Sequence, residues 1–199
     1  MTSTHSTTEP KLDKPGAGLP FIELAVAKYI MFPIVRNSTT PEKAIKVFSE
    51  ETDRINALVA SVKPESLTER RLVPRLTGLE DSSRYWSVAM AIDHLVIVGN
   101  GITQVILDLS SSGATKRPPR GTADVKPDPN VDAASTLDKF QQMSERFLAE
   151  TKTIDVNAFP SATFPHPWFG QLNAHGWLTL AGMHQRIHRK QIEKIVSLL

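Results

Sequence analysis

The chain has 199 residues, of which 40% are hydrophobic and 22% charged, with a formal net charge of +2 and no cysteine. The length suits one globular domain with its own core, and the lack of cysteine excludes disulfides, zinc–thiolate sites, iron–sulfur clusters and a cysteine nucleophile. Because the nearest approach to a basic cluster is "KRPPR" at 116–120, we expect no nucleic-acid binding.

The N-terminal part of the chain divides into a polar and an apolar stretch. Residues 1–18 are polar and predict a disordered tail with a solvated His5; they do not resemble a signal peptide, so we expect a cytoplasmic protein. In the apolar stretch 19–35, Pro20 can begin a helix and Pro33 should end it, which leaves too few residues to cross a bilayer. The stretch predicts a buried or docking helix, with a membrane-surface or partner-binding helix as the alternative.

Two long helices are expected in the first half of the chain. The first covers 39–62, with Thr40 as N-cap and Pro41 as the first helical residue. The second covers 82–113, is capped by Ser82 or Ser83, and is apolar nearly all round, which is typical of a buried helix.

Two glycines interrupt the second helix. Gly99 and Gly101 flank Asn100, and each glycine costs about 1 kcal/mol relative to alanine in a helix interior. The pair therefore predicts a kink, a break, or the close approach of a neighbouring element.

A proline-rich crossover at 113–134 leads to a third helix at about 135–152. An aromatic and proline-rich loop follows at 157–172, and a fourth helix begins after the N-cap Asn173 and continues to about 198. No segment predicts a strand. Four helices with one long connection indicate an all-α four-helix bundle over 39–199, in which the second and third helices run parallel, preceded by the tail and extra helix of 1–38.

The last helix carries two histidines, His184 and His188, four residues apart. They share a stripe with core-type residues such as Trp177 and Ile195, so the imidazoles should point inward, where unpaired polar groups are costly. The spacing is that of the H-E-x-x-H helix of zinc peptidases, but the glutamate is absent. A pair alone is more often solvated.

A third inward histidine, His94, lies on the buried second helix and can face the fourth helix across the bundle. Alone, it is more often a hydrogen-bonded core residue, so the case for a metal depends on convergence. Three imidazoles from two helices are the ligand set of a metal centre with open positions. Imidazole suits zinc, nickel, iron and copper alike.

Three segments resemble the DinB-like superfamily, the DinB/YfiT group of four-helix proteins. They are "WSVAMAIDHL" at 86–95, "HPWFGQLNAHGWL" at 166–178 and "HQRIHRKQI" at 184–192. The resemblance covers about residues 40–198, and the glycine pair around Asn100 departs from it. It implies an up-down-down-up chain path, a divalent metal held by His94, His184 and His188, and a homodimer.

The resemblance also implies an activity, that of a metal-dependent hydrolase or a thiol transferase acting on a small molecule such as a low-molecular-weight thiol. For the metal we favour zinc or nickel, with iron and manganese as alternatives. His166 is the candidate catalytic residue, as a proton shuttle or substrate contact, although a structural role for its loop is the other interpretation. No inward carboxylate marks a general base, so a non-catalytic metal- or small-ligand-binding bundle is the alternative function.

Overall fold

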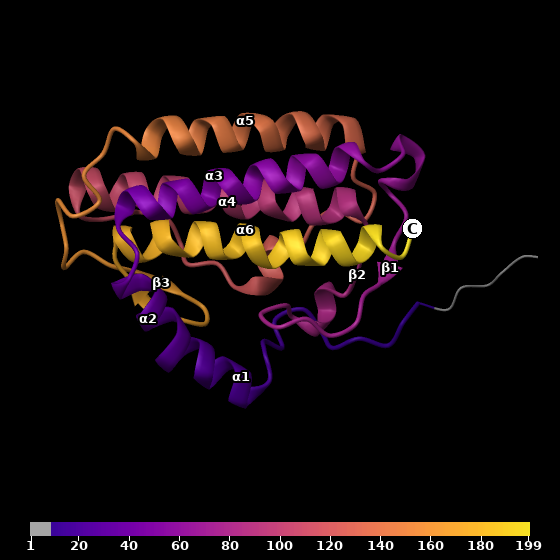
Figure 1. Cartoon of the computed structure of the whole chain (residues 1–199). Coiled ribbons are helices and arrows are strands. Elements are labelled where there is room, and N and C mark those ends of the chain that lie inside the picture. Colours follow the sequence, from indigo (N-terminus) through magenta and orange to yellow (C-terminus); the bar gives the residue numbers. More distant parts are fainter. Residues whose placement is uncertain (1–8) are drawn as a thin grey trace, which may run out of the picture.

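Four long helices form a bundle in the computed structural model, which describes residues 9–199. They are α3 (Pro41–Ala60), α4 (Val88–Ser112), α5 (Ala133–Thr151) and α6 (Ala174–Val196). α6 packs against α3 and α4, and α5 packs against α4. Figure 1 shows α3 and α6 running in one direction and α4 and α5 in the other, so the all-α bundle and its parallel second and third helices are confirmed.

Side-chain caps fix where three of these helices begin. Thr40 accepts a hydrogen bond from the backbone N–H of Lys43, and Asn173 accepts one from Gly176, as expected of N-cap residues. Asp132 caps α5 in the same way, so this helix begins at Ala133, two residues before the predicted start.

α4 begins later than the sequence predicts. Its N-cap is Ser87, which accepts a hydrogen bond from the backbone N–H of Met90, so the prediction of Ser82 or Ser83 is wrong. Those two serines lie in a 3-10 turn, Asp81–Ser83, and the next residues are extended because they pair with another segment. α4 is continuous through its glycines, without a break. A Cβ on Gly99 would lie 2.4 Å from Sδ of Met143, so this glycine lets α5 approach closely.

Two small antiparallel ribbons close the ends of the bundle. β1 (Arg71–Leu72) pairs with β2 (Tyr85–Trp86), and β3 (Phe164–His166) pairs with β4 (Gly170–Leu172). The sequence predicts no strand, because two or three residues are too short to show an alternation of apolar and polar side chains. Short 3-10 turns at Pro64–Ser66 and Thr122–Val125 complete the connections.

A helical segment precedes the bundle and passes through Pro33. It consists of α1 (Phe21–Val26), a π-helical stretch (Ala27–Met31) and α2 (Phe32–Asn37). The prediction that Pro33 ends the helix is wrong. Proline removes one hydrogen-bond donor and crowds the carbonyl of the preceding turn, and the wider π-helical turn directly before it accommodates both effects.

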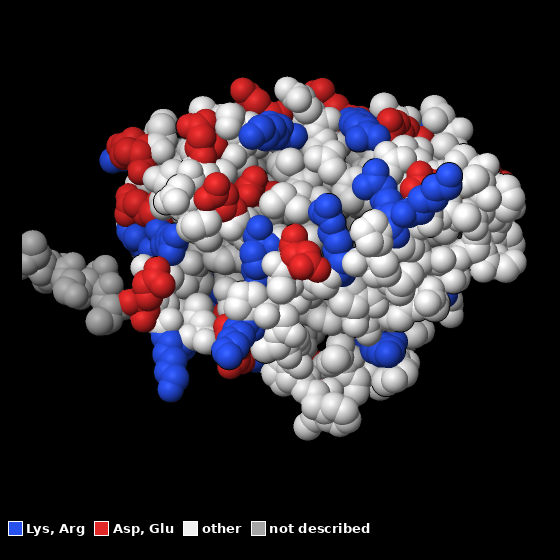
Figure 2. All heavy atoms as spheres, turned by 180° about the vertical axis from the view of Figure 1, so that it is seen from behind, with Lys and Arg blue, Asp and Glu red and all other residues white. Residues whose placement is uncertain are grey.

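The α1–α2 segment docks on the bundle by one face only. Glu23 accepts a hydrogen bond from the backbone N–H of Gly78 (2.7 Å), and the ring of Phe32 stacks on Phe169 with a centroid distance of 4.6 Å. The outer face is apolar and exposed: Phe21 is 84% and Ile22 77% exposed. In Figure 2 the projection at the bottom, formed around α1, shows uncharged atoms.

Residues 9–18 do not form the predicted disordered tail. The buried carboxylate of Glu80 accepts hydrogen bonds from the backbone N–H groups of Gly16 (3.1 Å) and Gly18 (2.9 Å), and Asp81 accepts one from Asp13. This segment is therefore attached to the loop before α4. The prediction for His5 lies outside the described residues.

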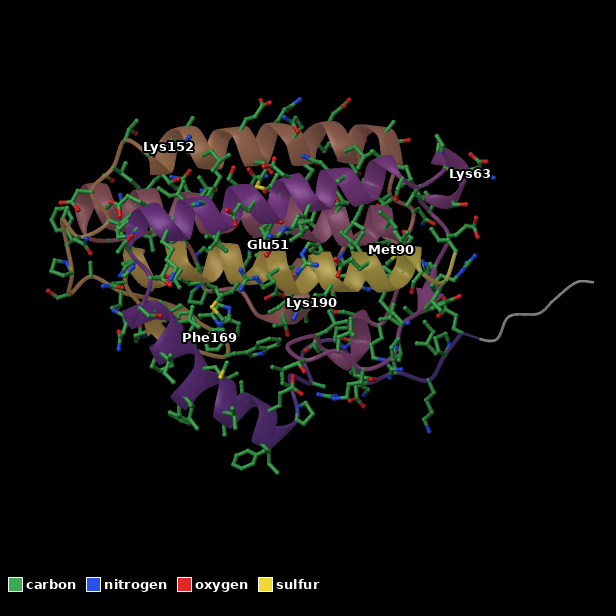
Figure 3. The ribbon with its side chains drawn as sticks, viewed as in Figure 1. Glu51, Lys63, Met90, Lys152, Phe169 and Lys190 are labelled. Atoms are coloured by element: carbon green, nitrogen blue, oxygen red, sulfur yellow. The ribbon has the colours of Figure 1, made fainter. Side chains whose placement is uncertain are left out.

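The joint between α3 and α6 contains a buried charge. Glu51 is almost fully buried and its carboxylate accepts hydrogen bonds from Nε of Arg186 (2.9 Å) and from Arg189, both on α6; Figure 3 labels it between the two helices. Burial alone would raise the pKa of Glu51, but these hydrogen bonds outweigh it and lower the pKa. The pair fixes α6 against α3 and so fixes which face of α6 turns inward.

Within the described part of the chain, α4 is the one helix long and apolar enough to span a membrane by length and composition. Of the 18-residue window concerned, 61% is buried inside the bundle, so α4 is a core helix of this fold. α4 is thus the central wall against which the functional side chains are placed.

Candidate metal centre

His94 on α4 and His184 and His188 on α6 converge on one point. One ring nitrogen from each lies within 4.8 Å of the others, and Nε2 of His94 lies 3.1 Å from Nε2 of His184. The convergence predicted from the inward stripes of two helices is therefore present. It follows from the packing of α4 against α6 and from the four-residue spacing, which stacks two imidazoles one turn apart.

The outer ring nitrogens of two of these histidines are held by hydrogen bonds. Nδ1–H of His94 donates to the backbone carbonyl of Val125 (2.7 Å), and Nδ1–H of His188 donates to Oε1 of Gln191 (2.7 Å). The orientation of the Gln191 amide is itself fixed, because its Nε2 donates to the carbonyl of Ser83 (2.7 Å). In both histidines the proton is thus on Nδ1, and Nε2 is left with a free lone pair.

Burial keeps the three rings neutral. It lowers the pKa of His94 to about 4, an effect that the Val125 hydrogen bond opposes and the nearby charge of Lys126 reinforces. Burial also lowers the pKa of His184 and His188 well below the usual value, and the neighbouring histidines lower both further. At neutral pH the three rings are therefore uncharged, and His94 and His188 present lone pairs to the cluster.

These features test whether a divalent metal would fit. Two nitrogens bound to one zinc ion at about 2.0–2.1 Å in tetrahedral geometry lie about 3.3 Å apart, close to the 3.1 Å between the two Nε2 atoms. Neutral imidazoles with their second nitrogen hydrogen-bonded are the form in which histidine binds metals. The donor set therefore fits a divalent cation.

A polar network supports the cluster from outside. Nζ of Lys126 donates to Oε2 of Glu80 (2.7 Å) and to Oγ of Ser83 (2.8 Å), and lies 5.3 Å from the centroid of the Trp86 ring. Trp86 in turn stacks on His188 at 6.1 Å. Lys126 is adjacent to Val125 in the chain, and the backbone carbonyl of Ser83 accepts the hydrogen bond from Gln191. The network therefore positions the Val125 carbonyl and Oε1 of Gln191, which accept the hydrogen bonds of His94 and His188.

Sequence reasoning missed these supporting residues. A signal existed for Gln191, which follows His188 by three residues on the same inward stripe. For the Val125 carbonyl and for Lys126 there was none, because they lie in the crossover loop, whose path no periodicity predicts.

The three histidines form one end of a cavity of about 780 Å³, within the range of small-molecule sites. His166, the candidate catalytic residue, also lines this cavity. Its Nδ1 accepts hydrogen bonds from the backbone N–H groups of Trp168 (3.1 Å) and Phe169 (3.3 Å), so its proton is on Nε2. Burial lowers the pKa of His166 to about 4. The neutral ring is thus a hydrogen-bond donor at Nε2.

Acidic side chains near the ligands in sequence or on the third helix of the bundle lie outside the cavity. Asp93 accepts a hydrogen bond from the backbone N–H of Asp128, and Asp138 and Glu145 are exposed on α5. Within residues 9–199, Glu80 is the only carboxylate that lines the cavity, and Lys126 neutralises it. His175 is half-buried, and its ring is hydrogen-bonded to the backbone carbonyl of Thr39 (2.8 Å).

The fold and the site together define a class, a helical bundle with a buried three-histidine cluster at the end of a ligand-sized cavity. Residues 47–192 match the family model described as the DinB superfamily, and the chain belongs to that superfamily. The resemblance found in the sequence is therefore confirmed.

A solved structure agrees with the fold. The chain is similar to "TT2238, a four-helix bundle protein", with 23% sequence identity and a TM-score of 0.54, over 77% of this chain and 98% of that one. At this level of identity the likeness shows the fold alone. No curated protein matches the chain.

Proposed function

We propose that this protein is a divalent-metal-dependent enzyme of the hydrolase or thiol-transferase type, with His94, His184 and His188 as its metal ligands. The observation that supports it is the convergence of three neutral imidazoles at one end of a cavity. Zinc or nickel is the metal we favour, since imidazole ligands suit both. When bound, such a cation would lower the pKa of a water or a thiol at its open position.

The chain's own residues supply the remaining parts of the site. Val125 and Gln191 hold the ring protons of His94 and His188 on the outer nitrogens, so that neither of these two rings has to release a proton before the metal binds. Nε2–H of His166 is available to donate a hydrogen bond to an oxygen or sulfur atom of a substrate in the cavity. Since no free carboxylate lines the cavity in the described part of the chain, the reaction that we propose is one that needs no protein base.

Elemental analysis of the purified protein tests the metal. We expect about one equivalent per chain in the wild type and loss of it in His184→Ala and His188→Ala, with helicity unchanged because the hydrophobic core is large. His175→Ala is the matched control, a histidine on the same helix outside the cluster. Unchanged metal content in the His184→Ala/His188→Ala double variant would overturn the ligand assignment.

Activity assays separate the enzyme from the alternative. The metal-loaded protein is assayed for hydrolysis of generic esters and amides and for transfer of small thiols. Turnover that disappears in His94→Ala supports the enzyme. Metal binding without turnover in any of these assays would support the non-catalytic binding protein, which the lack of a free carboxylate in the cavity favours.

A further inference from the structure

The cavity extends from the histidines along one face of α4. Gly101 and Val105 follow His94 by seven and eleven residues, which are close to two and three full helical turns, and all three line the cavity. Ile97 and Val98 line it between them. At a rise of about 1.5 Å per residue, the cavity therefore continues for about 15 Å beyond His94.

Gly101 leaves open space in this cavity. A Cβ built on Gly101 would meet no atom within 4 Å, whereas one on Gly99 would collide with Met143. The two glycines thus have different roles: Gly99 serves helix packing, and the room above Gly101 is not used by any neighbouring side chain. A larger residue at 101 would enter the cavity instead of the core.

The walls over this part of α4 are apolar. The aromatic loop contributes several rings, and the α1–α2 segment contributes aliphatic side chains from its inner face; they are Phe164, Trp168, Phe169, Ala27, Met31 and Val35. Figure 3 shows Phe169 beside α2, where the ring of Phe32 stacks on it. An apolar chain that lies on Gly101 would therefore share the cavity with mainly apolar side chains.

Basic side chains also line the cavity, and two of them lie beside the later turns of α4, away from His94. Nη2 of Arg146 donates a hydrogen bond to Oε1 of Gln104 (3.4 Å), and its Nε forms an ion pair with Glu150 (3.1 Å). Nε of Arg117 forms an ion pair with Asp108 (3.8 Å), so both guanidinium groups lie near the later turns of α4 and each has a carboxylate partner. Arg120 lines the cavity from the same loop as Arg117 and has no ion-pair partner within residues 9–199. We call Arg117, Arg120 and Arg146 the arginine end.

We propose that the cavity binds an elongated amphipathic anion. Its reactive group lies at the histidines, its apolar chain lies over Gly101, and its carboxylate or a similar anion lies at the arginine end. Guanidinium groups recognise carboxylates by paired hydrogen bonds, and apolar chains gain affinity with each buried methylene. This proposal rests on the proposed function for the reactive end of the ligand only.

The test uses zinc-loaded protein and a series of ω-mercaptoalkanoic acids of increasing length, with binding measured by calorimetry. Affinity should rise about fourfold per methylene, which corresponds to about 0.8 kcal/mol, until the carboxylate reaches the arginine end. The primary amides of the same compounds should bind at least tenfold more weakly. No dependence on chain length in the wild type would overturn the proposal.

Two sets of variants locate the subsites. Gly101→Leu should abolish the gain with chain length while zinc content stays unchanged, and Arg117→Gln/Arg120→Gln should remove the preference for the acid over the amide. Lys116→Gln, an exposed neighbour that does not line the cavity, is the control. The loop variants keep the proposal testable if Gly101→Leu does not fold. The proposal would be overturned if Gly101→Leu kept the wild-type gain of affinity with chain length and Arg117→Gln/Arg120→Gln kept the wild-type preference for the acid over the amide.

Plain alkanoic acids, which have no thiol, separate this proposal from the metal site. If the purified protein holds no metal but binds alkanoic acids with the expected dependence on length and on Gly101, the proposed function fails and the amphipathic cavity stands. If the protein holds zinc but affinity in the series does not depend on chain length or on Gly101, the amphipathic cavity fails and the proposed metal site stands.

Discussion

Nδ1–H of His188 donates a hydrogen bond to Oε1 of Gln191, one helical turn away on α6, at 2.7 Å. The glutamine is fully buried and its amide is fixed by the carbonyl of Ser83. This contact decides which nitrogen of His188 faces the cluster, because a ring that donates through Nδ1 must keep its lone pair on Nε2.

Gln191→Leu should therefore weaken metal binding without unfolding the bundle. Loss of an outer hydrogen-bond partner typically costs about 10–100-fold in metal affinity, and leucine has a similar volume. Zinc affinity is measured by competition with a chromophoric chelator. Gln141→Leu, an exposed glutamine on α5 that is hydrogen-bonded to Glu145, is the control and should bind zinc like the wild type. Equal zinc affinity in both variants would show that Gln191 does not position His188.

The metal-free protein should lose stability below about pH 6.5. Burial holds the pKa of His94 and His166 at about 4 in the folded state, whereas both titrate near 6.5 when unfolded. Between these values the unfolded chain binds more protons, so the free energy of unfolding falls as the pH falls, by at most about 1.4 kcal/mol per pH unit for each histidine.

Urea unfolding of the chelator-treated protein from about pH 7.5 to about pH 5 measures this effect above the titration range of the carboxylates. In His166→Gln one titrating group is absent, so the decrease should be shallower than in the wild type. If the wild type and His166→Gln lose stability equally, His166 is not held neutral by burial.

The glycine pair of α4 gives a prediction about stability. Gly99→Ala places a Cβ against Met143, which is buried, and overpacking costs about 1–3 kcal/mol. Gly101→Ala meets no atom and should stabilise α4 by about 1 kcal/mol through helix propensity. In urea unfolding, the free energy of unfolding should be higher for Gly101→Ala and lower for Gly99→Ala than for the wild type. The reverse order would contradict the packing described for the two positions.

How far the sequence predicts the fold and the site depends on how far apart in the chain the interacting residues lie. The positions of Thr40, Asn173 and the three histidines follow from local rules, namely capping and helical spacing. The cap at Ser87 was missed because β2, which delays α4, depends on pairing with a segment thirteen residues earlier.

The rest of the site depends on contacts between distant segments. Residues 9–18 have the composition of a disordered tail, yet Glu80 holds them by backbone hydrogen bonds that no composition reveals. The Val125 carbonyl meets His94 only through the path of the crossover loop. The different roles of Gly99 and Gly101 become visible only when α5 is in place beside one of them.

The outer face of the α1–α2 segment is where we expect the homodimer implied by the resemblance. Its side chains are 41–84% exposed, and they are Phe21, Ile22, Val26, Tyr29, Ile30 and Ile34. An aromatic side chain alone buries about 150–250 Å² on association, so six large apolar side chains approach the about 800 Å² per partner of a standard interface. A second copy offers the same apolar helix in return, as a two-fold interface requires.

Sedimentation of the purified protein should accordingly give a dimer, and Phe21→Ser/Ile22→Ser should give a monomer. Neither residue is buried in the single chain, so the variant should keep its helicity and its metal content. Leu72→Ser is the control, because Leu72 is also an exposed apolar residue (44%) but lies on β1, outside this face. A wild-type monomer, or a dimer that persists in Phe21→Ser/Ile22→Ser, would exclude this face as the interface. In a two-fold interface the same patch is present on both subunits, so the substitutions alter the contact twice.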